Sequence, residues 1–287
     1  MRRDRLDGLL FVGPFLALYL FLTIYPLLQG VLLSFARADL FGARVYVGLE
    51  NYLRLASDAV FHQALLNTFK VALMVVPPLT VITLLLALAL NKPGRTATLF
   101  RGVFFSSSVL SVTIVTLIWR FVLTPDAGLL AEFAERMGRP PLPWLSDPHL
   151  ALPALALTTI WWSIGLPMML FLAGLQQIPD DIYEAAALDR ASRWTTFWRV
   201  TLPSLRRTMV LVIMLQTAAQ LQMFGQAHLL TAGGPGGASR TMVLWIFETA
   251  FIRWELGYGA AAAEVLFLLI VTVTLIQYRA ATARGEP

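Results

Sequence analysis

Long apolar runs recur along this chain and predict membrane-spanning helices. A run of roughly 20 apolar residues, at about 1.5 Å per residue, crosses a hydrocarbon layer about 30 Å thick. Lipid offers no hydrogen-bond partners to the backbone, so each run must be helical. We therefore predict an all-α polytopic membrane protein with six transmembrane helices, at residues 8–35, 65–90, 99–123, 150–175, 209–230 and 258–277.

Prolines interrupt this pattern at several places. Pro26, Pro77, Pro78 and Pro167 fall inside predicted spans, where each removes a backbone donor, so we expect kinks there. Segment 241–254 is apolar on one side but too short and too charged to span. We predict a helix that lies at the outer surface or is tucked against the bundle.

The first apolar run also resembles a signal peptide, because Ala36-Arg37-Ala38 mimics a small-residue cleavage site. Signal peptides have apolar cores of only about 7–15 residues, whereas this run is much longer. We interpret it as an uncleaved first helix.

Composition agrees with a membrane protein. The chain has 287 residues, of which 57% are hydrophobic and 14% charged, whereas about a quarter of a soluble domain is charged. It has no cysteine and three histidines far apart in sequence, so we expect no metal site. The net charge of +5 is not gathered with aromatic residues into a basic patch, which excludes nucleic acid as a partner.

The distribution of Lys and Arg predicts the orientation. With the N-terminus in the cytoplasm, the inner segments carry more of these residues than the longer outer loops, as the positive-inside rule requires. We therefore expect both termini in the cytoplasm, in the cytoplasmic membrane of a bacterium or archaeon. This orientation also places residues 177–207 inside the cell.

Residues 177–207 form a charged island between two spans, and we call this island the coupling segment. Pro179 suits a helix N1 position, and Asp180 and Asp181 lie in the first turn, where the helix dipole favours them. Ser192 is expected to cap a second short helix that ends at Pro203. The alternative is an ordinary solvated loop, but the exposed-looking aromatic residues need something to pack on.

The coupling segment contains a characteristic run of residues, namely Glu184, Ala185, Ala186, Asp189, Ala191, Phe197, Val200, Leu202 and Pro203. This run resembles the EAA motif of ABC importer permeases. In that family the motif forms coupling helices that dock on a cytoplasmic ATP-binding subunit. Similar stretches in family order lie at 48–52, 66–68, 99–101, 104–105, 118–120, 172–179 and 230–241 and narrow the resemblance to carbohydrate permeases of the maltose and glycerol-phosphate type.

The chain departs from the family pattern at three positions. Arg190 stands where the motif has glycine, so it adopts a positive φ at some cost, the turn differs, or its side chain contacts the ATPase itself. Arg207 replaces a frequent proline. Gly225 replaces an aspartate in the fifth span, so the role of that aspartate is not carried over.

Four amides in the fifth predicted span are candidates for the substrate path. On a continuous helix at about 100° per residue, Gln216, Gln220, Gln222 and Gln226 share a stripe some 160° wide. Neutral amides suit sugar hydroxyls. An alternative of equal weight is that these amides form hydrogen bonds between helices. Phe224 joins the candidates because it and Gln222 match family positions.

Two further candidates lie in the fourth and sixth spans. Trp161, next to Trp162, could stack on a sugar face, although packing against lipid or helices is the stronger interpretation. Glu264 is a carboxylate inside a span, where it is costly unless paired or in water. We predict that it faces the bundle interior, lining the path or pairing with Arg253 or Arg240.

The resemblance implies a single permease domain over residues 1–287, with the ABC importer type I permease fold and with the coupling segment as its cytoplasmic feature. It implies a second, similar permease, two ATP-binding subunits and an extracytoplasmic sugar-binding protein that docks on residues 233–237 and 126–147. No Walker A loop or catalytic arrangement is present, so the chain is not an enzyme, binds no cofactor, and leaves ATP and Mg²⁺ to partner chains. The alternatives are a permease for another solute, such as glycerol phosphate or a polyamine, and a secondary transporter or receptor-like protein outside the ABC class.

Overall fold

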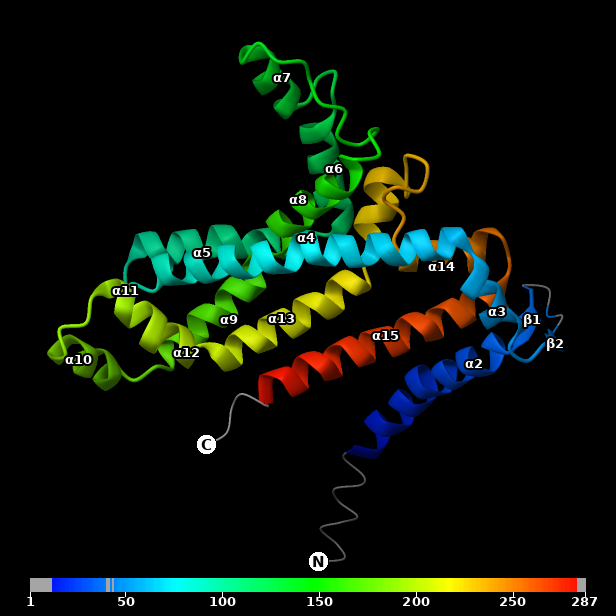
Figure 1. The fold of residues 1–287 in the computed structure, drawn as a ribbon, viewed down its shortest axis with the longest axis horizontal. Coiled ribbons are helices and arrows are strands. Elements are labelled where there is room, and N and C mark those ends of the chain that lie inside the picture. Colours follow the sequence, from blue (N-terminus) through cyan, green and yellow to red (C-terminus); the bar gives the residue numbers. More distant parts are fainter. Residues whose placement is uncertain (1–11, 40–41, 43, 283–287) are drawn as a thin grey trace, which may run out of the picture. The chain divides into compact units, whose positions relative to one another are not determined.

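A computed structural model describes residues 12–39, 42 and 44–282 (Figure 1). The regular secondary structure of the described residues is helical apart from one two-stranded sheet, which confirms the all-α prediction. Residues 8–11 of the first predicted span lie outside the described residues, as do Arg2, Arg3, Arg5 and Arg284, which count toward the predicted orientation.

The elements follow one another as short and long helices, with π-helical segments labelled η. They are η1 Leu20–Ile24, α2 Tyr25–Ser34, β1 Ala36–Ala38, β2 Arg44–Tyr46, α3 Glu50–Ser57, α4 Ala59–Leu90, α5 Arg95–Ser107, α6 Val112–Leu123, α7 Leu129–Arg136, α8 Ala151–Ser163, α9 Gly165–Gln176, α10 Asp180–Leu188, α11 Arg193–Thr196, η2 Phe197–Thr201, α12 Leu202–Ser204, α13 Arg206–Leu221, η3 Ala227–Thr231, α14 Met242–Phe247, η4 Glu248–Ile252 and α15 Leu256–Thr282.

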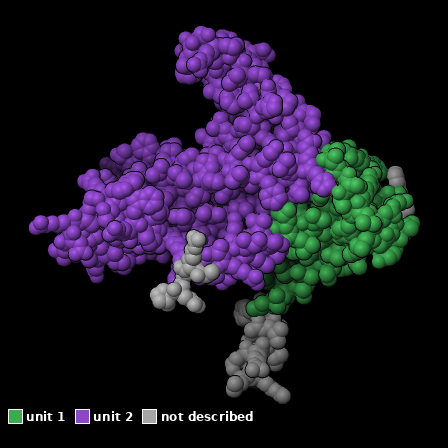
Figure 2. All heavy atoms as spheres, in the orientation of Figure 1, with its two compact units in different colours: residues 1–61, 245–269 green, residues 62–244, 270–287 purple. Residues whose placement is uncertain are grey.

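Two compact units divide the chain (Figure 2). Unit 1 comprises residues 1–61 and 245–269, and unit 2 comprises residues 62–244 and 270–287. The sequence predicts a single domain, whereas the packing groups residues into these two units. Each unit is described by itself below.

Three predicted spans are continuous helices, over Val12–Ser34, Ala59–Leu90 and Leu256–Thr282. The first contains the π-helical turn η1 directly before Pro26, where the missing proline N–H disturbs the regular ladder. The second runs through Pro77 and Pro78 as one helix.

The third and fourth predicted spans are broken, which corrects the expectation of single helices. Helices α5 and α6 meet at 96°, and α8 and α9 at 47°. The fourth span breaks near Ile164 and not at Pro167, which lies inside α9. The fifth is broken too, because α13 ends at Leu221 and helical structure resumes only beyond Phe224.

The two breaks in the third and fourth spans share hydrogen bonds. Ser108 Oγ lies 3.2 Å from Trp162 O and accepts from Gly165 N at 3.1 Å. Trp162 Nε1 donates to Leu110 O at 3.0 Å. A Cβ at Gly165 would lie 2.9 Å from Phe105 Cα, so the glycine permits this close approach.

Within unit 1, residues 48–52 tie the end of the first span to strand β1. Asn51 Nδ2 donates to Ser34 O at 2.9 Å and to Ala36 O at 3.0 Å, and the Tyr52 hydroxyl donates to Ser34 Oγ at 2.7 Å. These bonds satisfy carbonyl groups that a helix end leaves without partners. The stretch that mimicked a cleavage site is β1, which pairs antiparallel with β2.

Asp58, also in unit 1, caps helix α4. Its carboxylate accepts from Val60 N at 2.8 Å and Phe61 N at 3.1 Å, and from the Tyr258 hydroxyl at 2.9 Å. Burial raises the pKa of Asp58, but these hydrogen bonds outweigh it and bring the pKa below its ordinary value. Arg54 lies over the Tyr258 ring, 3.9 Å from its centroid.

Segment 241–254 forms α14 and η4. Met242, Leu244 and Trp245 are buried. The structure therefore supports the tucked arrangement and not the helix lying on the surface.

Candidate functional site

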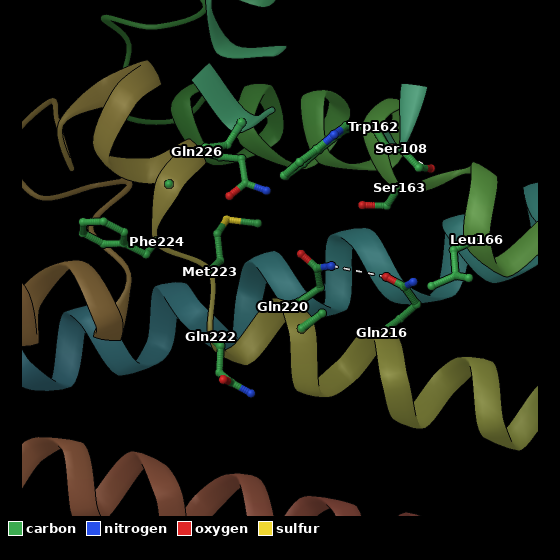
Figure 3. Close-up of a pocket in the computed structure, with 13 residues that line it drawn as sticks. Ser108, Trp162, Ser163, Leu166, Gln216, Gln220, Gln222, Met223, Phe224 and Gln226 are labelled. Atoms are coloured by element: carbon green, nitrogen blue, oxygen red, sulfur yellow. Dashed lines mark hydrogen bonds between the residues drawn. The ribbon is translucent and has the colours of Figure 1, made fainter. Parts of the chain in front are cut away.

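A cavity of about 550 Å³ in unit 2 lies where the broken third, fourth and fifth spans meet (Figure 3). We call it the amide cavity. It is lined by Ser108, Val112, Trp162, Ser163, Leu166, Gln216, Ala219, Gln220, Gln222, Met223, Phe224, Gly225 and Gln226. None of these residues carries a charge, so the cavity offers donors and acceptors without an ionic group.

The structure brings all four predicted glutamines to this cavity, but not as one helical stripe. Gln216 and Gln220 lie on α13, and Gln220 Nε2 donates to Gln216 Oε1 at 3.4 Å. Gln226 follows the helix break and is buried. Gln222, at the C-cap of α13, is exposed and donates to Ala218 O at 3.2 Å. Figure 3 shows it pointing away from Gln220. The break therefore corrects the continuous-helix geometry.

Trp162, and not Trp161, is the tryptophan at the cavity. Its hydrogen bond to Leu110 O fixes the ring, which Figure 3 shows beside the cavity. Trp161 instead packs edge-on against Trp119, with ring centroids 6.0 Å apart. The sequence placed both tryptophans in the fourth span but could not distinguish their faces.

Phe224 lies in the break in the fifth span, and Gly225 begins the helical structure that follows it. Phe224 stacks on His228 with centroids 5.2 Å apart. A Cβ at Gly225 would lie 2.8 Å from Val112 Cγ2, so α6 leaves little room for the aspartate of the family pattern. Glycine in place of the family's aspartate at position 225 therefore fits the close packing of α6 against this residue.

Glu264 lies on the part of α15 that belongs to unit 1. It is half-buried, and its Oε1 would lie 3.5 Å from a Cβ placed on Gly30 of α2. In the described part of the chain it forms no ion pair with Arg253 or Arg240. The carboxylate thus points toward α2, as expected of a side chain that faces protein, and it lies outside the amide cavity.

The coupling segment presents its predicted residues to solvent. Glu184, Ala185, Asp189 and Arg190 are exposed, whereas Ala186 and Ala191 are half-buried. Figure 1 shows α10 and α11 at the end of α9. The segment also exposes Leu188, Trp194 and Trp198, at 85%, 69% and 50%.

The backbone conformation of Arg190, which stands where the motif has glycine, shows which kind of turn forms there. Its φ is 52°, so the turn is left-handed. Arg190 N donates to Ala187 O and Ala191 N to Ala186 O, both at 3.0 Å. This pair of bonds is the Schellman ending of a helix, in which glycine is favoured at the position of Arg190. The turn at Arg190 is thus one that favours glycine, and arginine adopts it under strain.

The ends of the coupling segment are anchored in the bundle. Ile178 and Leu205 are buried in a core with Phe171 and Leu175 of α9 and Val212 of α13. The Tyr183 hydroxyl lies 3.2 Å from Thr201 Oγ1, joining α10 to η2.

The other expectations for this segment are partly corrected. Asp180 and Asp181 do begin α10, and Ser192 Oγ accepts from Thr195 N at 3.2 Å, as predicted. Pro179 is the N-cap and not N1. Pro203 lies inside α12, so helical structure continues to Ser204.

Residues 231–241 form a loop that we call the GGPGG loop. Side chains of α4 hold it in place. Asn67 Nδ2 donates to Gly237 O at 2.9 Å and to Arg240 O at 3.1 Å, and Thr68 Oγ1 accepts from Met242 N at 2.8 Å. Ser239 Oγ donates to Thr231 Oγ1 at 2.7 Å. Two stretches singled out separately in the sequence thus bind one another.

No group of three or more His, Asp or Glu residues that could hold a metal occurs in the described residues. The amide cavity and the coupling segment are therefore the features to which a function is assigned.

These features define a multi-spanning helical membrane transport component. The chain belongs to the family of binding-protein-dependent transport system inner membrane components, whose model matches residues 60–284. That family comprises membrane subunits of transporters, and no enzyme activity resides in this chain.

Named relatives agree over nearly the full length. The chain is 31% identical to the sulfoquinovosyl glycerol transport system permease protein SmoG of Agrobacterium fabrum, covering 96% of this chain and 90% of the relative. It is 30% identical to the arabinooligosaccharides transport system permease protein AraP of Bacillus subtilis, with 96% and 89% covered.

The fold is that of a solved transporter chain. A bacterial alginate ABC transporter, in complex with an alginate pentasaccharide-bound periplasmic protein, contains a chain with a TM-score of 0.85 to this one. The two are 20% identical, with 96% and 93% covered. The predicted ABC importer permease fold is confirmed.

Proposed function

We propose that this chain is the membrane subunit of an ATP-driven importer for a carbohydrate, with the amide cavity as part of its substrate path. The observation that carries the proposal is the uncharged, amide-rich lining of that cavity in a member of this transport family. Sugar hydroxyls are donors and acceptors, and Gln216, Gln220 and Gln226 offer both. Trp162 offers a fixed apolar face.

The proposal favours a neutral sugar over other solutes. Glycerol phosphate would call for arginine on the path, and a polyamine would call for carboxylates. Neither occurs among the residues of the amide cavity. The one carboxylate expected on the path, Glu264, lies on a different unit and faces α2.

The partners follow from the coupling segment and from the relatives. An exposed helix that ends in a Schellman turn and carries uncovered apolar side chains suits docking on a soluble ATP-binding subunit. A second, similar permease, two such subunits and an extracytoplasmic sugar-binding protein would complete the transporter. ATP and Mg²⁺ would then bind to the ATP-binding subunits and not to this chain.

The mechanism we infer is alternating access. Closure of the ATP-binding subunits would move the coupling segment around Glu184 and Asp189. The buried core that holds Ile178 and Leu205 would transmit this movement to α9 and α13 as rigid bodies. Helix α13 carries Gln216 and Gln220, so the movement reaches the amide cavity directly.

The orientation, with both termini and the coupling segment in the cytoplasm, belongs to the proposal. The GGPGG loop and residues 126–147, which include α7, would then face the binding protein. The two units would act as one permease domain.

The first experiment measures ATP hydrolysis by the reconstituted transporter in response to loaded binding protein. We expect stimulation by a neutral oligosaccharide. Gln220→Ala should weaken this response about tenfold and leave ATPase binding intact, because it removes one buried amide that orients the substrate. Gln277→Ala, an amide outside the cavity, is the matched control. Equal stimulation of both variants and wild type would overturn the role of the amide cavity.

The second experiment tests the coupling segment. Glu184→Lys should abolish co-purification of the ATP-binding subunit. Glu135→Lys, an exposed glutamate on α7, should not. If no ATP-binding subunit purifies with wild type, the coupling segment is not the docking site that we propose.

A further inference from the structure

A second hollow in unit 2 lies far along α13 from the amide cavity. It is a groove of about 740 Å³ between the first turns of α13 and the last turns of α15, near the red end of Figure 1. A smaller hollow of about 290 Å³ continues it toward Ile213, Met214 and Ala280. The two hollows share Arg206, Val210 and Ala281, so they adjoin, and we describe them together as one groove.

The two ends of this groove differ in chemistry. The wide end is lined by Arg206, Arg207, Ser204 and Tyr278, and no acidic residue lines either part. The narrow end is mainly apolar. One polar, cationic end and one apolar end match an amphiphile with an anionic head.

The two arginines are placed differently. Arg206 Nη2 donates to Ala281 O at 2.7 Å, which holds its guanidinium at the neck of the groove. Arg207 is exposed and makes no hydrogen bond or ion pair in the described part of the chain. Its five donors are therefore available to a phosphate group.

The ends of two predicted spans meet at this groove, which is where a membrane surface is expected. It joins the start of one predicted span to the end of another, and Tyr278 beside it is 56% exposed. Tyrosine is enriched at the membrane–water interface, where its ring is half in lipid and its hydroxyl is hydrated.

We propose that this groove binds an anionic phospholipid. Arg207 contacts the phosphate of the headgroup, with Arg206 adding charge at the neck. One acyl chain runs past Val210 along Met214 and Ala280. Basic pockets between membrane helices are known to favour anionic headgroups. The site is separate from the proposed sugar path, although Ser204, Arg206 and Arg207 are also the last residues of the coupling segment. The test therefore measures lipid on the chain alone, and a loss of lipid binding leaves the proposed transport function standing.

The test uses the purified full chain in bilayer discs made from equal parts of phosphatidylglycerol and phosphatidylethanolamine. Lipid that remains bound after extraction is counted by native mass spectrometry. We expect wild type to retain phosphatidylglycerol in preference. Arg207→Gln should lower the retained amount about fivefold, since one interfacial arginine contributes about 1 kcal/mol.

Arg279→Gln is the matched control, because this arginine lies at the same end of α15 but does not line the groove. It should leave retention unchanged. Equal loss in Arg279→Gln and Arg207→Gln would overturn the site, since the effect would then be general surface charge.

Two further measurements separate a lipid from a free anion and from misfolding. Val210→Phe narrows the neck without changing charge, and should also reduce phosphatidylglycerol retention. Inorganic phosphate added at millimolar concentration should not displace the lipid. Displacement by phosphate, or full retention in Val210→Phe, would show that the acyl chain does not occupy the groove and would overturn the proposal.

Discussion

The GGPGG loop and the coupling segment both connect helices in unit 2. The loop has its backbone groups hydrogen-bonded within the chain, whereas the coupling segment leaves apolar side chains exposed. The loop is satisfied from within the chain, because Asn67 of α4 binds two of its carbonyls and Thr68 binds the backbone N–H of Met242, which follows it. The coupling segment is anchored to the core chiefly through Ile178 and Leu205 and leaves Leu188 and Trp194 uncovered. The first arrangement preserves a shape, whereas the second presents a surface.

This difference separates two reasons for a sequence motif. Buried polar residues such as Asn67 are needed for folding, since a buried carbonyl without a donor is costly. Exposed apolar residues such as Leu188 gain nothing in the isolated chain and are explained by a partner. Substitutions should therefore affect stability in one region and binding in the other.

The largest effect is expected at Asn67. Asn67→Leu should lower the free energy of unfolding by roughly 3 kcal/mol, because two carbonyls of the GGPGG loop lose their donor. Thermal unfolding of the purified chain in detergent measures this. Asn91→Leu, at an exposed asparagine, is the control and should change little. Equal stability of both variants would contradict the bracing role.

Leu188→Glu should show the opposite pattern. Affinity for the ATP-binding subunit should fall at least tenfold, roughly 1.4 kcal/mol. The unfolding temperature should hardly move, because the side chain is 85% exposed. Titration of the labelled subunit measures the affinity, with Phe133→Glu on α7 as the control. A large loss of stability would show that Leu188 packs within the chain.

Gly233→Ala should destabilise the GGPGG loop by about 1–2 kcal/mol. Gly233 has a φ of +76°, and an added Cβ would lie 3.1 Å from Leu244 Cδ2. The same unfolding assay tests this. Gly138→Ala, with positive φ but open space around it, separates strain from crowding.

Arg190→Gly tests the corresponding position in the coupling segment. Glycine relieves the left-handed strain but adds freedom to the unfolded chain, so stability should rise by only about 0.5 kcal/mol. If ATPase binding falls while stability rises, Arg190 contacts the subunit itself. If both are unchanged or improved, the arginine serves no docking role.

The smallest effect concerns Asp58 in unit 1. Because the pKa of Asp58 is lowered on folding, its stabilising contribution is present above the ordinary value of 3.8 and is lost as the pH falls below it. Asp58→Asn should remove this part of the pH dependence. Unfolding measured between about pH 6 and pH 3 compares the two proteins.

Much of the fold follows from local pattern. Apolar runs of about 20 residues predict spans because lipid burial acts on every residue of the run. The start of α10 at Asp180 and the cap at Ser192 were predicted for a similar reason, since capping joins residues only a few positions apart.

The breaks within the spans could not be predicted in this way. Three serines end at Ser108, but such a short polar run does not by itself predict a bend, and hydropathy does not fall at Ile164. The bends depend on hydrogen bonds between residues over 50 positions apart. The geometry of the candidate site could not be predicted from local sequence either. Four glutamines were recognised by type, but the break after Leu221 decides that Gln226 is buried while Gln222 is exposed.

The sequence by itself determined the class of protein, the coupling segment and the set of polar residues available to a substrate. The tertiary structure decided that Trp162 and not Trp161 lines the amide cavity, that Glu264 faces Gly30, and that Asn67 braces a loop 170 residues away. The physical reason is the separation along the sequence over which each interaction acts. Burial in lipid, capping and turn geometry act between neighbours in sequence, whereas a cavity forms only where distant helices leave space between them.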